Sequence, residues 1–225
     1  MKSAIVALVL SAGAARVEPT TLTFGPDEAP IDFVVPDAAS VRVWCATCGP
    51  ESGALSAAEP ASQGRFRARF TFPKERLPRV VLLAVEARSA KGERTFTWVP
   101  LPLLANASLK IETKPRASVT VSIGSRTFGP ANANGAGKLT VPVVVAPGYP
   151  SATVVAGDRA GNVTTSSINL AAQPFPQAAA ALPVAEVIAD QRADLELFAV
   201  TAEGAALTDV ARLKVSARLG TTEAP

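Results

Sequence analysis

The chain has 225 residues, a formal net charge of +3, two cysteines and no histidine. The absence of histidine excludes a histidine-based catalytic triad and removes the commonest protein ligand for zinc and other transition metals. A charge this small gives no footprint for nucleic-acid binding, so we expect no catalytic residues, no cofactor, no metal and no nucleic-acid partner.

The first fifteen residues have the pattern of a secretory signal peptide. Lys2 supplies the positive charge, residues 3–11 (SAIVALVLS) form a short apolar core, and residues 12–14 (AGA) are small enough for a signal peptidase. The apolar run is shorter than the ~18 residues that a membrane-spanning helix needs. We predict export, with the mature chain beginning near Ala15 or Arg16; a buried N-terminal strand or helix is the alternative.

Residues 16–104 are expected to form the first β-sandwich, and their clearest strand is 65–72. It places four apolar side chains on one face and three arginines on the other, namely Phe66, Ala68, Phe70 and Phe72 against Arg65, Arg67 and Arg69. Guanidinium groups aligned on one face suit carboxylates or phosphates, so the arginines are the candidate surface for an anionic ligand. The alternative is a solvated face neutralised by cross-strand acids, for which Glu86 and Glu93 are the candidates.

The two cysteines, Cys45 and Cys48, directly follow a predicted strand. Two cysteines without histidine cannot supply an ordinary zinc site. In an oxidising compartment we predict a structural disulfide that pins a turn. A redox-active pair and two unbridged or partner-bound cysteines are the alternatives.

The strand predicted at 79–87 (RVVLLAVEA) is apolar on both faces until Glu86. This pattern is typical of a central strand or of one whose outer face meets a neighbour. The chain's two tryptophans, Trp44 and Trp98, are the candidates for an aromatic platform that stacks on a ligand. The alternative is that both are buried in the sandwich core. Strict alternation places Trp44 on the same face as Arg42.

Residues 105–172 are expected to form a second β-sandwich, with an alternating strand at 118–123. A turn motif occurs in three copies along the chain, at 89–92 (SAKG), 158–161 (DRAG) and 201–204 (TAEG). A small oxygen-bearing residue opens each copy and glycine closes it, which predicts a hairpin turn with a bulge. Asn134-Gly135 marks a further turn within a flexible stretch.

Asp158 and Asn162 carry oxygen atoms that suit calcium. Two side-chain ligands are too few for that ion, and an aspartate at the first position of a turn has a local structural role. We therefore interpret Asp158 as a turn residue and expect no metal site.

Two tracts interrupt the strand pattern and predict linkers, because proline cannot donate to a sheet ladder. The first is Pro100-Leu101-Pro102, and the second is the Pro/Ala tract at 173–183. Residues 184–225 contain one of the turns and one further strand candidate, at 213–219. They are expected to be the first half of a third sandwich.

Residues 118–170 resemble the immunoglobulin-like repeats of bacterial exported and cell-surface proteins. The resemblance lies in 127–130 (TFGP), 141–145 (VPVVV), Pro147-Gly148 and 156–162 (AGDRAGN). Residues 195–220 are similar to the opening half of an invasin-type repeat. The resemblance implies an all-β fold of tandem immunoglobulin-like antiparallel β-sandwich modules, the last one incomplete.

In that family such modules serve as stalks, spacers or binding domains of larger envelope proteins. We therefore predict a non-enzymatic spacer or interaction segment of the bacterial envelope or surface. Its expected partner is a protein or glycan there, and it is expected to have no transmembrane helix of its own and to be covalently continuous with a larger anchored protein. The alternatives are a self-contained periplasmic or secreted binder of carbohydrate or protein, a redox protein, and a hydrolase that uses carboxylates alone.

Overall fold

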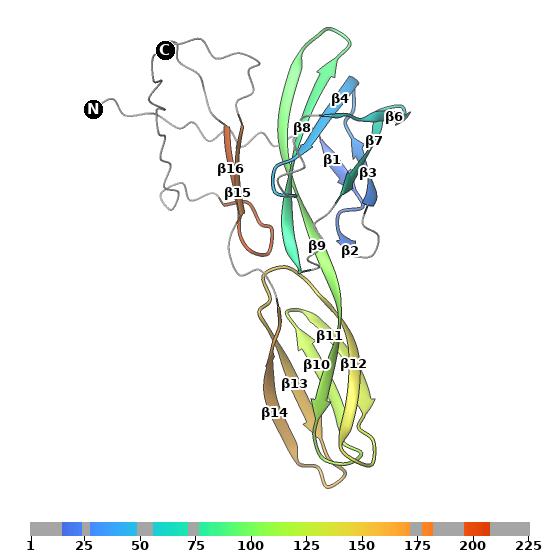
Figure 1. The fold of residues 1–225 in the computed structure, drawn as a ribbon, viewed down its shortest axis with the longest axis vertical. Helices are drawn as coiled ribbons and strands as arrows, with labels where there is room; N and C mark the ends of the chain where they lie inside the picture. Colours follow the sequence, from blue (N-terminus) through green and yellow to red (C-terminus); the bar gives the residue numbers. More distant parts are fainter. Residues whose placement is uncertain are drawn as a thin grey trace, which may run out of the picture.

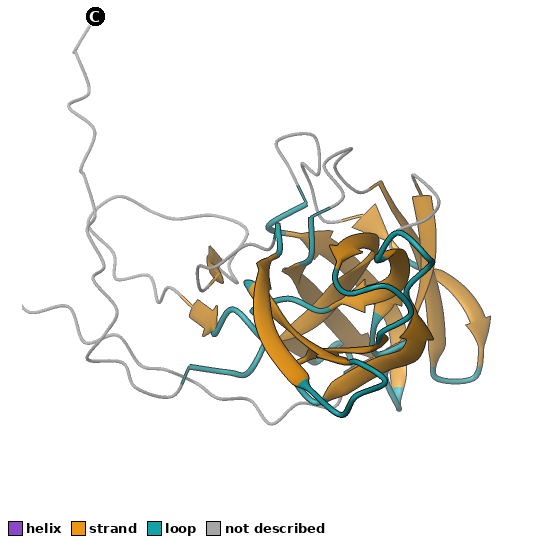
Figure 2. Cartoon of the chain, turned by 90° about the horizontal axis from the view of Figure 1, so that it is seen from below, coloured by secondary structure: helices purple, strands orange, loops and turns teal. Residues whose placement is uncertain are grey.

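The structure, a computed structural model, describes residues 15–23, 28–48, 56–71, 77–171, 177–181 and 196–207. These residues form strands, turns and loops without any helix (Figure 2), which confirms the predicted all-β fold. A helix able to cross a membrane is therefore also absent from them. The predicted signal peptide, apart from Ala15, and the strand predicted at 213–219 lie outside the described residues.

The first sandwich consists of two sheets that face each other. One has the strand order β1-β3-β7-β6, and the other continues through β5, β4, β8 and β9. These strands are β1 (Arg16–Glu18), β3 (Glu28–Val34), β4 (Ala38–Cys45), β5 (Ser56–Ala57), β6 (Glu59–Ser62), β7 (Arg65–Thr71), β8 (Arg79–Ser89) and β9 (Arg94–Glu112). Short β2 (Leu22–Thr23) runs parallel to β9.

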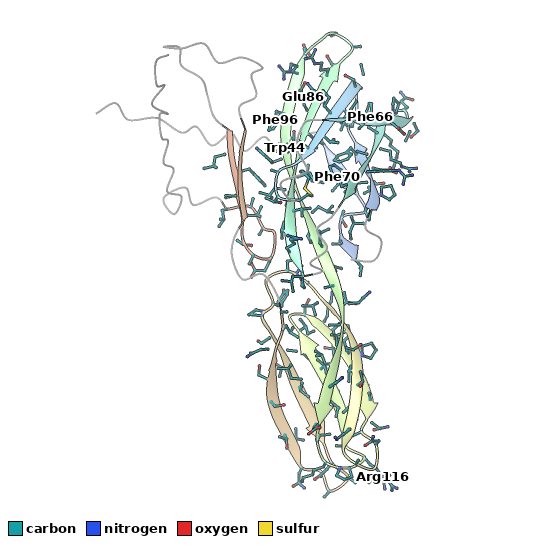
Figure 3. All side chains as sticks on the ribbon, viewed as in Figure 1. Trp44, Phe66, Phe70, Glu86, Phe96 and Arg116 are labelled. Atoms are coloured by element: carbon teal, nitrogen blue, oxygen red, sulfur yellow. A yellow bond between two sulfur atoms is a disulfide. The ribbon has the colours of Figure 1, made fainter. Side chains whose placement is uncertain are left out.

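The core of this sandwich is filled by one face of each sheet. Phe66, Ala68 and Phe70 of β7 are buried against residues such as Val43 and Leu83 of the opposite sheet. Figure 3 labels Phe66 and Phe70 among these side chains. The alternation predicted for 65–72 is confirmed as far as Phe70, and Phe72 lies outside the described residues.

Strand β9 belongs to both sandwiches. Its first part pairs with β8, from Arg94 to Leu103, and its second part pairs with β12, from Ala105 to Glu112. Figure 1 shows this strand passing without a break from one sandwich into the other. The predicted boundary at 104/105 thus falls inside one continuous strand.

The prediction of a linker at Pro100-Leu101-Pro102 is wrong, because these residues lie within β9 and pair with β8. Residues two apart direct their backbone nitrogens to the same edge of a strand. Among the described residues, the edge of β9 away from β8 has no partner strand before Leu103. Both prolines therefore fit where their nitrogens face this edge and no ladder hydrogen bond is lost.

The second sandwich packs a four-stranded sheet against β9 and β12. Its sheet order is β11-β10-β13-β14. The strands are β10 (Ser118–Ile123), β11 (Arg126–Asn132), β12 (Lys138–Val145), β13 (Ser151–Gly157) and β14 (Val163–Asn169). Val119, Val121 and Ile123 point into the core, as the alternation predicts, and meet Val141 and Val143 of β12.

A two-stranded sheet lies beside the first sandwich (Figure 1) and corrects the second linker prediction. Strand β15 (Gln177–Ala181) falls in the tract 173–183 and pairs with β16 (Glu196–Val200). Alanines give no alternating signal, yet their backbone groups pair like any others. Val200 packs on Val80 and Leu82 of β8, so the prediction that the outer face of β8 meets a neighbour is confirmed.

The three predicted turns have the predicted form. In each, the glycine has a positive φ, of 85°, 86° and 96° in chain order. The glycine N–H donates to the carbonyl of the first residue, whose own N–H donates to the carbonyl of the fifth. Residues 134–138 repeat both hydrogen bonds, so the stretch around Asn134 is an ordered fourth copy, with Gly137 in the left-handed position.

Candidate functional site

The arginines of β7 face the acids of the neighbouring strands β1 and β3. Arg65 Nη1 lies 2.7 Å from Glu18 Oε2. Arg67 donates two hydrogen bonds to Asp32, at 2.6 Å and 2.9 Å. Arg69 is exposed and has no ion pair with any described residue. Glu86 and Glu93 are not the partners, because both lie outside the sheet that contains β7.

Two of the three positive charges on the outer face of β7 are therefore each neutralised by one carboxylate. The hydrogen bond from Arg67 lowers the pKa of the Asp32 carboxyl below its ordinary value. Exposed pairs of this kind stabilise a fold only weakly. The structure gives this predicted anionic-ligand face little positive charge beyond Arg69.

A second arginine cluster lies on the outer face of the opposite sheet. Arg94 Nη2 lies 2.8 Å from Glu86 Oε2, Arg88 Nε lies 3.5 Å from Oε1, and Arg42 Nη1 lies 3.9 Å from Oε2. The Glu86 side chain is 3% exposed, whereas those of Arg42, Arg88 and Arg94 are 47%, 51% and 39% exposed. Three guanidinium groups thus surround one buried carboxylate.

Glu86 is ionised despite its burial. Burial alone raises the pKa of a carboxyl. The hydrogen bond from Arg94 and the charges of Arg94 and Arg42 outweigh this and hold the pKa of Glu86 below its ordinary value. The cluster therefore carries three positive charges and one negative charge near neutral pH.

An aromatic patch adjoins this cluster on the same face. Trp44 and Phe96 lie with their ring centroids 6.2 Å and 5.5 Å from that of Trp98. All three rings are half-buried, so neither a fully buried core position nor a fully open platform describes them. Figure 3 labels Trp44, Glu86 and Phe96 close together along β4, β8 and β9. The predicted placement of Trp44 on the face of Arg42 agrees with the burial of Val41 and Val43 on the opposite face.

Cys45 and Cys48 are disulfide-bonded, with Cα atoms 5.5 Å apart. Both side chains are buried in the core of the first sandwich. The bridge follows the end of β4, where Ala46 N–H donates to the carbonyl of Leu82 and Thr47 Oγ1 accepts from Leu82 N–H. A buried disulfide fixed in this way is suited to a structural role.

Asp158 holds the turn between β13 and β14, the role interpreted for it from the sequence. Asp158 Oδ2 accepts hydrogen bonds from Lys114 Nζ at 2.7 Å and Asn162 Nδ2 at 2.9 Å, and Oδ1 accepts two backbone N–H groups. These contacts lower the pKa of the carboxyl, with the bond from Lys114 as the largest cause. In the described part of the chain no three histidine, cysteine or acidic residues gather as a metal site.

The Arg42, Arg88 and Arg94 cluster was not among the residues predicted from the sequence. The signal was present, because Glu86 breaks an otherwise apolar strand on the face that also carries Arg88. The registers that bring Arg42 opposite Glu86 and Arg94 opposite Arg88 depend on the pairing of β4, β8 and β9. The sequence alone does not specify that pairing.

Solved structures resemble this chain weakly. A calcium-stabilised adhesin of an Antarctic bacterium has 11% identity and a TM-score of 0.27, covering 70% of this chain and 48% of the adhesin, about half its length. The periplasmic chaperone SfaE has 16% identity and a TM-score of 0.26, and the match covers 69% of this chain and 97% of the chaperone. Tandem Ig domains of titin have 11% identity and a TM-score of 0.22, and the match covers 71% of this chain and 97% of the titin chain. No protein-family model and no curated protein sequence matches the chain.

Proposed function

We propose that the chain is a non-enzymatic, exported protein of tandem immunoglobulin-like modules that acts as a rigid spacer and interaction segment of the bacterial envelope or surface. The observation that carries this proposal is β9, which has 19 residues and is shared by the two sandwiches. A hydrogen-bonded strand cannot bend freely as a Gly/Ser linker does. The two sandwiches are therefore held at a set distance, as a stalk requires.

Spacer rigidity is testable by a distance measurement across the junction. Spin labels at an exposed position of each sandwich, Lys91 and Arg159, are expected to give one narrow distance distribution. Insertion of Gly-Ser-Gly-Ser after Ala105, inside β9, is the matched control and should broaden it. A broad distribution in the uninserted chain contradicts the spacer proposal.

Export and envelope location rest on the signal-peptide pattern of residues 1–15 and need a separate test. An antibody to the first sandwich, used on fractionated native cells, reports both compartment and apparent mass. A band far above 23 kDa in the outer membrane or at the surface supports a stalk within a larger protein. A band in the cytoplasm contradicts export.

A second candidate function is a ligand-binding module, which the outer face of β4, β8 and β9 favours. Half-buried aromatic rings beside charged groups are typical of sites that bind small molecules or glycans. The chain contains no histidine, and its disulfide is buried in the core. The side chains of this face are therefore suited to binding a ligand by stacking and ion pairing.

A further inference from the structure

We propose that the outer face of β4, β8 and β9, where Arg42, Arg88 and Arg94 adjoin Trp44 and Phe96, binds an acidic polysaccharide. This inference deepens the second candidate function, on which it rests, and it is independent of the spacer role. The ligand class follows from three features of the face: its excess charge, the position of its buried carboxylate and the neighbouring aromatic rings.

The first feature is charge. All three arginines pair with the single carboxylate of Glu86. Among the described residues, the two charges of Arg88 and Arg94 already exceed the one charge of that carboxylate. On the opposite sheet, Arg65 and Arg67 each have an acid of their own, in Glu18 and Asp32. On the β8 side several arginines thus share one acid, whereas on β7 only Arg69 has no ion pair with a described residue.

The second feature is the placement of Glu86 beneath the arginines. Its side chain is buried, while all three guanidinium-bearing side chains are exposed to solvent. A ligand approaching from solvent thus meets the cations first. The carboxylate reduces the mutual repulsion of the arginines and positions them, so Glu86 is a positioning residue. Guanidinium groups held in this way suit the carboxylates of uronic acids.

The third feature is the adjacent aromatic row. Phe96 and Arg42 both lie opposite Glu86, and Trp44 and Trp98 both lie opposite Ala84, two residues along the same strand. Residues two apart on a strand are separated by about 7 Å. A sugar ring stacked on an aromatic side chain therefore carries its carboxylate within reach of the arginines. Three arginines are too few for the row of phosphate contacts that nucleic acids use.

The experiment is a fluorescence titration of the full chain with polygalacturonate. Trp44 and Trp98 are the chain's two tryptophans, and both lie on this face, so tryptophan emission reports on it directly. We expect saturable quenching by polygalacturonate and none by the fully methyl-esterified polymer, in which every carboxylate is neutral.

The test variant is R42Q/R88Q, which keeps the closest partner of Glu86, Arg94. It should weaken binding about tenfold, because charge-assisted contacts are lost. The matched control R65Q/R67Q removes the same charge from the opposite sheet and should leave the affinity unchanged. If the double variant unfolds, Arg88→Gln alone, the most exposed of the three, replaces it and should also weaken binding.

Four outcomes overturn the inference. Equal losses in R42Q/R88Q and R65Q/R67Q mean that net charge alone attracts the polymer. Binding of duplex DNA as tight as that of polygalacturonate means an unselective polyanion surface. Equal binding of the methyl-esterified polymer removes the acidic preference and leaves the ligand-binding function standing, whereas no binding of either polymer counts against both.

Discussion

Phe198 of β16 stacks on Trp98 of β9, with 6° between the ring planes and 6.3 Å between the centroids. The two residues are 100 positions apart in the sequence and belong to different sheets. With Val200, which is fully buried on Val80 and Leu82, this contact covers the outer face of β8 around those two residues. The hairpin of β15 and β16 therefore borders the aromatic patch.

Phe198→Ala should detach this hairpin from the first sandwich. We expect Trp98 to become more exposed, so that tryptophan emission shifts to longer wavelength. The half-buried ring should contribute about 1–2 kcal/mol to the stability of the chain. Fluorescence and urea unfolding measure the two effects.

Phe128→Ala is the control, because Phe128 is also half-buried but packs in the second sandwich. It should lower stability without moving the tryptophan emission. An unchanged emission spectrum in Phe198→Ala would contradict the stacking.

The sequence predicts faces better than it predicts partners. Alternation alone identified the buried and exposed sides of β7 and the need for a cover on β8. It could not identify which strand neighbours which, and β7 lies between β3 and β6 rather than beside β8. This is why the sequence offers Glu86 and Glu93, which lie outside the sheet of β7, as candidate partners of the β7 arginines. The correct acids, Glu18 and Asp32, come from strands that pair only through long-range contacts.

Both failed linker predictions have one physical cause. Proline and alanine tracts carry no signal of a strand, because the signal comes from side-chain alternation and propensity. Pro100 and Pro102 sit in a strand where their missing N–H groups cost nothing, and the alanines of β15 pair through their backbone. Backbone pairing of this kind is decided by tertiary context.

The turn at 134–138 allows two neighbouring glycines to be compared. Gly137 has a φ of 77°, and a Cβ there would clash with the carbonyl oxygen of Thr113; Gly135 has no positive φ and open space around it. Gly137→Ala should destabilise the chain by at least about 1–2 kcal/mol. Gly135→Ala should be neutral or stabilise it by up to about 1 kcal/mol. Thermal unfolding of both variants decides this, and equal effects would contradict the turn geometry.

Removing the disulfide should leave the first sandwich folded. The bridge closes a loop of four residues, for which the chain-entropy relation gives about 2 kcal/mol. Cys45→Ser with Cys48→Ser also places two hydroxyls among buried apolar groups, so Cys45→Ala with Cys48→Ala should be the milder pair. Circular dichroism and urea unfolding test this expectation. A chain that loses its β signal in the alanine pair would show that the bridge is required for folding.

The stability of the chain should fall in acid partly through Glu86. The folded-state pKa of its carboxyl lies below the ordinary value of 4.5, because Arg94 and Arg42 outweigh the effect of burial. Glu86 therefore stabilises the fold above that ordinary pKa, and this contribution is lost as pH falls through the lower folded-state pKa. Asp32 and Asp158 act in the same direction, since their pKa values are also lowered.

Arg94→Gln isolates the contribution of Glu86. The variant removes the 2.8 Å hydrogen bond and leaves the burial, so the pKa of Glu86 should rise and stability should begin to fall at a higher pH. At pH 7 we expect a loss of about 1–3 kcal/mol. Adding Glu86→Gln to Arg94→Gln removes the buried charge and should abolish the shift in the pH profile. Urea unfolding across the acid range measures both, and parallel profiles for the wild type and Arg94→Gln would show that Arg94 does not hold the carboxyl in its ionised form.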